Sequence, residues 1–291
     1  MNNNISRRCG IFAAAAAVLA ATAAVLLFLR LENDFDFSIR HFTCGTGALV
    51  LTFLPIVLGV LLALAAGFAV GKKPLPENVS FSSLFPTFAA ALLACLLAAS
   101  CVFDFMNASA TAGAYSASLV GTYTALLRVR GVLSLLSAVY FVVVVIGQGR
   151  IKPDAPVARW SVLLPLVWAL LTTICLYFDG RMPINDPIKA LTMLFSIGLV
   201  AAAVAEGRLR FRRGTCAVPA VLLTFAVAVG GIAVAALASA VREAVSNLPS
   251  AFGFSVMESA LYTAAFLFAA ARLTSLGKEV PASDVVEAPK A

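Results

Sequence analysis

The sequence predicts an all-α integral membrane protein, a polytopic bundle of about eight transmembrane helices with both termini in the cytoplasm. Of the 291 residues, 62% are hydrophobic and only 12% are charged, whereas soluble domains average about 45–50% apolar and about 25% charged residues. Apolar stretches long enough to cross a bilayer recur along the chain. Basic residues gather in short runs beside these stretches, as expected for residues that set membrane topology.

Eight segments meet the requirement of about 20 mostly apolar residues for a spanning helix. They are 11–29, 47–70, 84–103, 131–147, 160–178, 188–205, 217–241 and 251–271. The fourth segment is short unless it begins near Ser118 and carries Arg128 and Arg130 at its outer end. We expect residues 1–271 to form one transmembrane domain. Residues 272–291 are polar and contain two prolines, and we expect them to form a disordered cytoplasmic tail.

The first segment follows Arg7 and Arg8, and a basic pair before an apolar stretch is also typical of a secretory signal peptide. That alternative leaves seven spans. We expect a retained helix instead, because the stretch 11–29 is longer than the apolar region of about 7–15 residues in signal peptides. In the third and fifth segments, Pro86 and Pro165 lie near the helix start, where the missing amide of proline costs little.

The distribution of lysine and arginine gives the orientation. Of the 21 basic residues, fourteen fall on the side that carries both termini. The other side has Arg30, Arg40, Arg128, Arg130, Arg181, Lys189 and Arg242. Cytoplasmic loops carry the excess of basic residues, so both termini are predicted to be inside, where the basic runs meet anionic lipid headgroups. The net charge of +7 does not indicate nucleic-acid binding, since no soluble unit with a basic face is predicted.

Ionisable residues inside hydrocarbon are costly and often functional. Asp104 and Asp179 end the third and fifth segments, and Glu258 lies within the eighth; the topology places all three toward the outer face. One hypothesis is a polar cavity that binds a cation, a proton or a small polar solute. The alternative is that the aspartates mark where helices meet water and that an arginine neutralises Glu258. The candidate outer cluster comprises Asp104, Asn107, Arg128, Arg130, Asp179, Arg181, Asn185 and Glu258.

The stretch 179–189 is the densest polar feature and predicts a tight outer turn between two helices. Asn185 or Asp186 is expected to cap the following helix, with Pro187 in its first turn. Such capping explains these residues without any ligand. Within segment 217–241, Gly231, Ala235 and Ser239 are spaced four apart and predict close approach by another helix.

The third and fifth segments begin and end alike, which suggests duplication of a helical hairpin. Phe81-Ser82-Ser83-Leu84-Phe85-Pro86 and Trp160-Ser161-Val162-Leu163-Leu164-Pro165 share an aromatic residue, a serine, a leucine and a proline in register. Chance similarity between two apolar helices is the alternative. The segment from Asp179 to Lys189, with Glu206-Gly207-Arg208, resembles uncharacterised multispanning membrane proteins of clostridial-type bacteria. This resemblance supports the predicted topology and implies no particular activity. The expected location is a cell membrane, the cytoplasmic membrane of a bacterium.

Several classes of function are disfavoured by what the sequence lacks. His41 is the single histidine, which excludes a histidine-based metal site or catalytic triad. No nucleotide-binding glycine motif and no paired-cysteine motif occur, and we expect no cofactor and no nucleic-acid partner. The leading hypothesis is a small-solute transporter or permease. The alternative is a membrane sensor or accessory subunit without transport activity. An intramembrane enzyme is less favoured, because the acidic residues of this sequence are dispersed and not paired.

Overall fold

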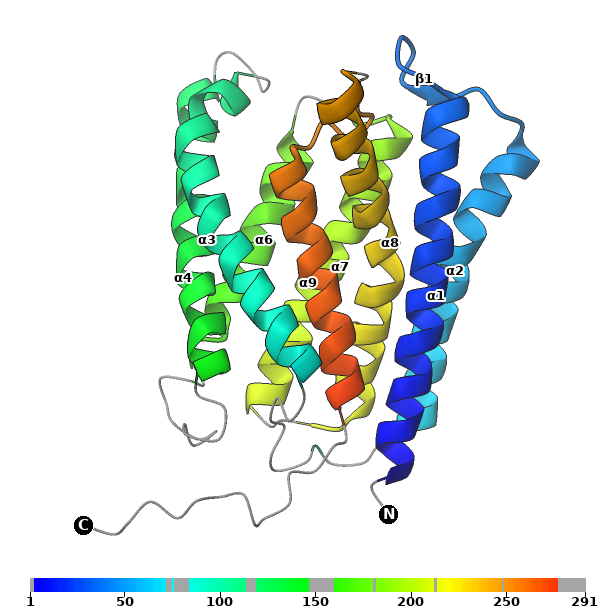
Figure 1. Ribbon diagram of the computed structural model, residues 1–291, viewed down its shortest axis with the longest axis vertical. Coiled ribbons are helices and arrows are strands. Elements are labelled where there is room, and N and C mark those ends of the chain that lie inside the picture. Colours follow the sequence, from blue (N-terminus) through cyan, green and yellow to red (C-terminus); the bar gives the residue numbers. More distant parts are fainter. Residues whose placement is uncertain are drawn as a thin grey trace.

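Long helices that run along a common direction make up the described part of the chain (Figure 1). The computed structural model describes residues 3–71, 75, 84–113, 119–146, 160–179, 182–211, 214–247 and 249–276, except the side chains of 3–5 and 111. The helices are α1 (Asn3–Asn33), α2 (Thr46–Val70), α3 (Leu84–Ala112), α4 (Val120–Ile146), α6 (Leu163–Phe178), α7 (Pro187–Phe211), α8 (Ala217–Ser246) and α9 (Val256–Ser275). Strands β1 (Phe35–Asp36) and β2 (His41–Phe42) pair between α1 and α2.

The predicted all-α membrane bundle is confirmed. Within the described residues, seven helices are long and apolar enough to cross a membrane. The remaining one, α6, has 16 residues and is about 24 Å long, shorter than the roughly 30 Å hydrocarbon core. The start of α1 and the end of α9 lie at the same end of the bundle, at the bottom of Figure 1. We call this the inner end; that it faces the cytoplasm stays a prediction.

Helix α8 forms the centre of the bundle and packs against α1, α2, α7 and α9. Glycines allow these contacts to be close, because a glycine at the point where two helices cross has no side chain to keep the backbones apart. At Gly231 a Cβ atom would lie 2.2 Å from the carbonyl oxygen of Ala20 on α1. At Gly59 on α2 it would lie 2.4 Å from Cβ of Ala228. The predicted close approach at Gly231 is confirmed, and α1 is a packed member of the bundle.

Several helix boundaries differ from the predicted segments, and three of them concern residues of the charge clusters. Helix α4 begins at Val120 and not at residue 131, which confirms the alternative start near Ser118 and places Arg128 and Arg130 in the outer half of the helix. The last helix does not begin at residue 251 but at Val256, because Ser255 caps it in a capping box with Glu258. Helix α9 continues to Ser275, so Arg272 is a buried helical residue and was wrongly assigned to a polar tail. Residues 277–291 lie outside the described part of the chain.

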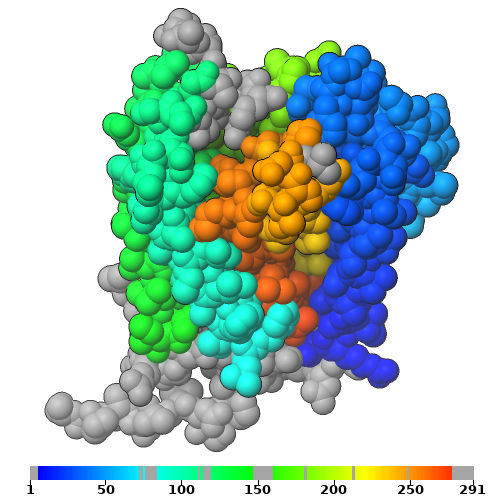
Figure 2. All heavy atoms as spheres, turned by 45° about the horizontal axis from the view of Figure 1, so that its top comes forward, coloured from blue at the N-terminus to red at the C-terminus, as the bar shows by residue number. Residues whose placement is uncertain are grey.

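The two hairpins α1–α2 and α3–α4 flank the central helices. Figure 2 brings the outer end forward and shows α3 and α4 on one side, α1 and α2 on the other, and the connection from α8 to α9 between them. Helix α3 packs against both α4 and α9, and α4 also packs against α6. The α3–α4 hairpin therefore covers α6 and α9. The proposed duplication of this hairpin stays a prediction.

Three outer connections are joined through one arginine. Arg40, in the β1–β2 turn, donates from Nε to Oδ2 of Asp186 at 2.6 Å and from Nη2 to the carbonyl oxygen of Ala251 at 3.0 Å. The other carboxylate oxygen of Asp186 accepts from the Ile188 amide at 2.8 Å. Asp186 is therefore the predicted cap of α7, while Asn185 is exposed. The β1–β2 hairpin itself was not predicted, since each strand has only two residues.

This arrangement predicts a graded series of substitutions at the α7 cap. Replacing Asp186 with alanine removes both the cap and the partner of Arg40, and is expected to lower the free energy of unfolding by about 1–2 kcal/mol. Asp186→Asn keeps an oxygen that accepts from the Ile188 amide and should cost less. Asn185→Ala, the matched control one residue away, should be neutral. Thermal unfolding in detergent measures all three, and equal losses for Asp186→Ala and Asn185→Ala would contradict the assignment.

Candidate functional site

A buried cluster of one arginine and two carboxylates lies toward the outer end of the bundle. Arg130 on α4 donates to Asp104 on α3 through Nε to Oδ2 at 3.0 Å and through Nη2 to Oδ1 at 2.5 Å. The same Nη2 lies 3.4 Å from Oε1 of Glu258 on α9. The exposed fractions of Arg130, Asp104 and Glu258 are 6%, 3% and 6%. We call these three residues the outer cluster.

Local sequence features position each member of the outer cluster. Gly131 follows Arg130, and a Cβ there would lie 3.1 Å from Cβ of Asp104, so the glycine brings α3 and α4 together at the ion pair. Glu258 is fixed by the capping box of α9, where its Oε2 accepts from the amide and hydroxyl of Ser255 at 3.2 and 3.1 Å. The two oxygens of Glu258 are therefore divided between the helix cap and Arg130.

The charges of the outer cluster do not balance among its own members. One guanidinium faces two carboxyl groups, so the cluster would carry a net negative charge with both carboxylates ionised. An uncompensated charge is expensive where water is excluded. A proton or a small cation beside Asp104 or Glu258 would remove that imbalance. The chemistry open to this cluster is thus uptake and release of a positive charge.

A second buried cluster lies toward the inner end and was not predicted. Glu206 on α7 accepts from Arg272 on α9, Nε to Oε2 at 2.6 Å and Nη2 to Oε1 at 3.0 Å. Its Oε1 also accepts from the Tyr140 hydroxyl at 2.8 Å and from Arg210 Nε at 3.1 Å. The side chains of Arg272 and Glu206 are 1% and 3% exposed. We call Tyr140, Glu206, Arg210 and Arg272 the inner cluster; it has two cations and one anion.

The two clusters share helices. On α9, Glu258 and Arg272 are fourteen residues apart, or about 21 Å along the helix axis. On α4, Arg130 and Tyr140 are ten residues apart, or about 15 Å. The clusters therefore occupy different depths of the same bundle.

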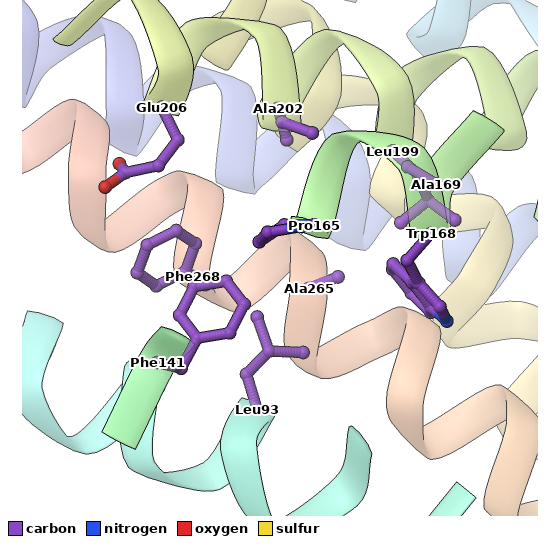
Figure 3. Close-up of a pocket in the computed structure, with 11 residues that line it drawn as sticks. Leu93, Phe141, Pro165, Trp168, Ala169, Leu199, Ala202, Glu206, Ala265 and Phe268 are labelled. Carbon is purple, nitrogen blue, oxygen red and sulfur yellow. The ribbon is translucent and has the colours of Figure 1, made fainter. Parts of the chain in front are cut away.

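A small apolar cavity adjoins the inner cluster, with Glu206 in its lining (Figure 3). Its volume is about 30 Å³, room for about one or two water molecules. Five helices wall it: α3, α4, α6, α7 and α9, with Leu93, Phe141, Trp168 and Phe268 among the lining residues. Among the described residues that line it, Glu206 alone is charged. Ala265, also in the lining, lies on α9 seven residues from each of Glu258 and Arg272.

Among the other predicted site residues that the structure describes, the hydrogen bonds found lead elsewhere than to the outer cluster. Asp179 and Lys189 are both buried, and Lys189 Nζ donates to the carbonyl oxygen of Asp179 at 2.7 Å. Asn107 donates to its own helix, at the carbonyl oxygen of Phe103. Arg128 and Asn185 are exposed, and Arg181 lies outside the described residues. The alternative that Asp104 and Asp179 mark contact with water is wrong, because both residues are buried and Asp104 is paired with Arg130.

Comparisons with protein-family models, with curated proteins and with solved structures found no match to this chain. The resemblance to clostridial-type multispanning proteins therefore stays a prediction. The structure itself identifies the chain as a multispanning integral membrane protein of the all-α class.

Proposed function

We propose that the protein is a small-solute transporter or permease in which the outer and inner clusters act as gates. The observation that carries this proposal is the placement of two buried charge clusters at different depths on shared helices, with a cavity that adjoins the inner cluster at Glu206 and reaches Ala265, midway along α9. In this state both clusters are closed and the cavity is small. A solute would enter after one cluster separates and leave after the other does.

Stability alone does not explain why these buried charges are present. Replacing a buried ion pair with apolar residues of similar size is often neutral or stabilising. A bundle that needed only stability would thus gain little from Arg130 or Arg272. Ionisable residues within membrane helices commonly mark solute or ion pathways. Charge pairs that can separate and re-form give a helix bundle two alternative arrangements, as a gate requires.

Two helices that line the cavity also carry buried hydroxyl groups outside its present lining. Thr172 Oγ1 on α6 and Ser259 Oγ on α9 are buried and have no hydrogen-bond partner among the described residues. Both helices contribute to the cavity lining. Buried hydroxyl groups usually find partners in proteins. A bound solute or water could satisfy them when the cavity enlarges.

The proposal can be tested without knowing the solute. In a background with the six cysteines replaced, Ala265→Cys places a thiol in the cavity lining. A charged, membrane-impermeant thiol reagent is then added to one face or the other of oriented vesicles. Asp104→Asn should raise the labelling rate from the outer end by roughly tenfold, the effect of about 1.4 kcal/mol on the gating equilibrium. Glu206→Gln should do the same from the inner end.

The control is Arg128→Gln, which changes an exposed charge close to the outer cluster and should leave both rates unchanged. Transport is supported if Asp104→Asn raises the labelling rate only from the outer end and Glu206→Gln raises it only from the inner end. A rise from both faces in either variant would indicate general loosening, and unchanged rates in both would indicate a static bundle. Either result would overturn the proposal, and the second would favour a sensor or accessory subunit.

A further inference from the structure

An open groove lies between α6 and α7 at the inner end of the bundle. Its volume is about 490 Å³, within the range of about 300–1,000 Å³ typical of small-molecule sites. Its walls are mainly apolar and include Leu163 and Leu166 from α6, and Val204 and Phe211 from α7. An apolar groove of this size on a membrane helix pair suits a hydrocarbon chain better than a soluble molecule.

The helices themselves create the groove. With 16 residues, α6 is about 13 Å shorter than the 25-residue α7. Gly207, in the groove lining, adds no side chain, and a Cβ at that position would meet no atom within 4 Å. The groove therefore follows from a short helix beside a longer one that carries a glycine at the same level.

One end of the groove has the chemistry of a membrane interface. Trp160 precedes α6 and packs edge-to-face on Phe211, with ring centroids 5.5 Å apart. Tryptophan is enriched at the boundary between hydrocarbon and headgroups. Arg208 also lines the groove, is exposed, and makes no hydrogen bond or ion pair with another described residue. A guanidinium in this position can bind phosphate through more than one N–H group.

We propose that this groove binds an anionic glycerophospholipid, with an acyl chain along Leu163, Leu166 and Val204 and the phosphate at Arg208. The apolar walls exclude a free phosphate as the main ligand, and the cation selects a lipid with net negative charge. The site is separate from both charge clusters and does not depend on the proposed transport function. Its loss would leave the gating experiment unaffected.

Quenching of Trp160 fluorescence by brominated lipids tests the proposal. The chain has two tryptophans, so Trp168→Phe leaves Trp160 as the only one. The full-length protein is placed in phosphatidylcholine vesicles with a minor fraction of brominated phosphatidylglycerol or brominated phosphatidylcholine. We expect phosphatidylglycerol to quench about fivefold more effectively, the enrichment that one basic residue gives near anionic lipid. Arg208→Gln should abolish that preference.

The matched control is Arg7→Gln, which removes an exposed arginine near the start of α1, at the same end of the bundle, and should retain the preference. Equal quenching by the two lipids, or loss of preference in both variants, would overturn the proposal. If Trp168→Phe does not fold, native mass spectrometry of the otherwise unchanged protein replaces the quenching assay. The site is supported if only Arg208→Gln retains one phosphatidylglycerol molecule fewer. It is refuted if Arg208→Gln and Arg7→Gln retain equal numbers of phosphatidylglycerol molecules. It is also refuted if the protein is a dimer without bound lipid, because a second copy would then cover the groove.

Discussion

Arg130→Gln is expected to lower the free energy of unfolding by about 3–5 kcal/mol, the cost of removing one partner of a buried ion pair. The substitution leaves Asp104 and Glu258 facing each other without a cation. Arg128→Gln removes the same charge two residues away on the same helix, where the side chain is exposed. That control should change stability by no more than about 0.5 kcal/mol.

Unfolding in mixed micelles, followed by circular dichroism against the mole fraction of denaturing detergent, measures both variants. A second comparison separates charge from packing. Adding Glu258→Gln to Arg130→Gln removes one stranded carboxylate while retaining an oxygen that can accept from Ser255, and should recover part of the loss. Equal stability of Arg130→Gln and Arg128→Gln would show that the outer cluster contributes nothing to the fold.

Arg272→Gln is expected to have a comparable effect at the inner end, again about 3–5 kcal/mol. Arg272 makes two of the hydrogen bonds to Glu206, and its side chain is among the least exposed in the described part of the chain. The same unfolding assay applies, with Arg7→Gln as an exposed control at the same end.

A double-mutant cycle tests whether the loss comes from the pair itself. Glu206→Gln and Arg272→Gln are measured singly and together, and a coupling free energy of about 0.5–3 kcal/mol is expected for residues in contact. Additive losses would mean that the two side chains act independently. That outcome would also weaken the proposed role of the inner cluster as a gate.

The fold class was predictable because it depends on composition and on the lengths of apolar stretches. Asp104, Arg130 and Glu258 were predictable as site residues because they are charges within or beside such stretches. Which of Arg128 and Arg130 faces the protein was not predictable. Two positions along a helix differ by about 200° in direction, and only the packing of α3 on α4 at Gly131 decides between them.

The inner cluster was missed because a charged residue was taken as the end of a span. Arg272 ended the apolar run, yet it lies inside α9, where Glu206 compensates its charge. Hydropathy cannot reveal a partner 66 residues away. The start of α9, in contrast, could have been found, because Ser255-Val256-Met257-Glu258 is a capping-box sequence. The preceding Phe252 and Phe254 hid this boundary, since they are apolar but lie outside the helix.

Helix α9 connects the two ends of the molecule mechanically. It carries an acid near its first turn and a base in its last turn, Glu258 and Arg272, and its backbone hydrogen bonds make it stiff along its length. A small axial slide of such a rod cannot disturb one terminus without shifting the other by the same distance. Under the proposed transport function, a displacement of Glu258 caused by a change of charge in the outer cluster would therefore move Arg272 by the same distance, without a relay of side chains between them.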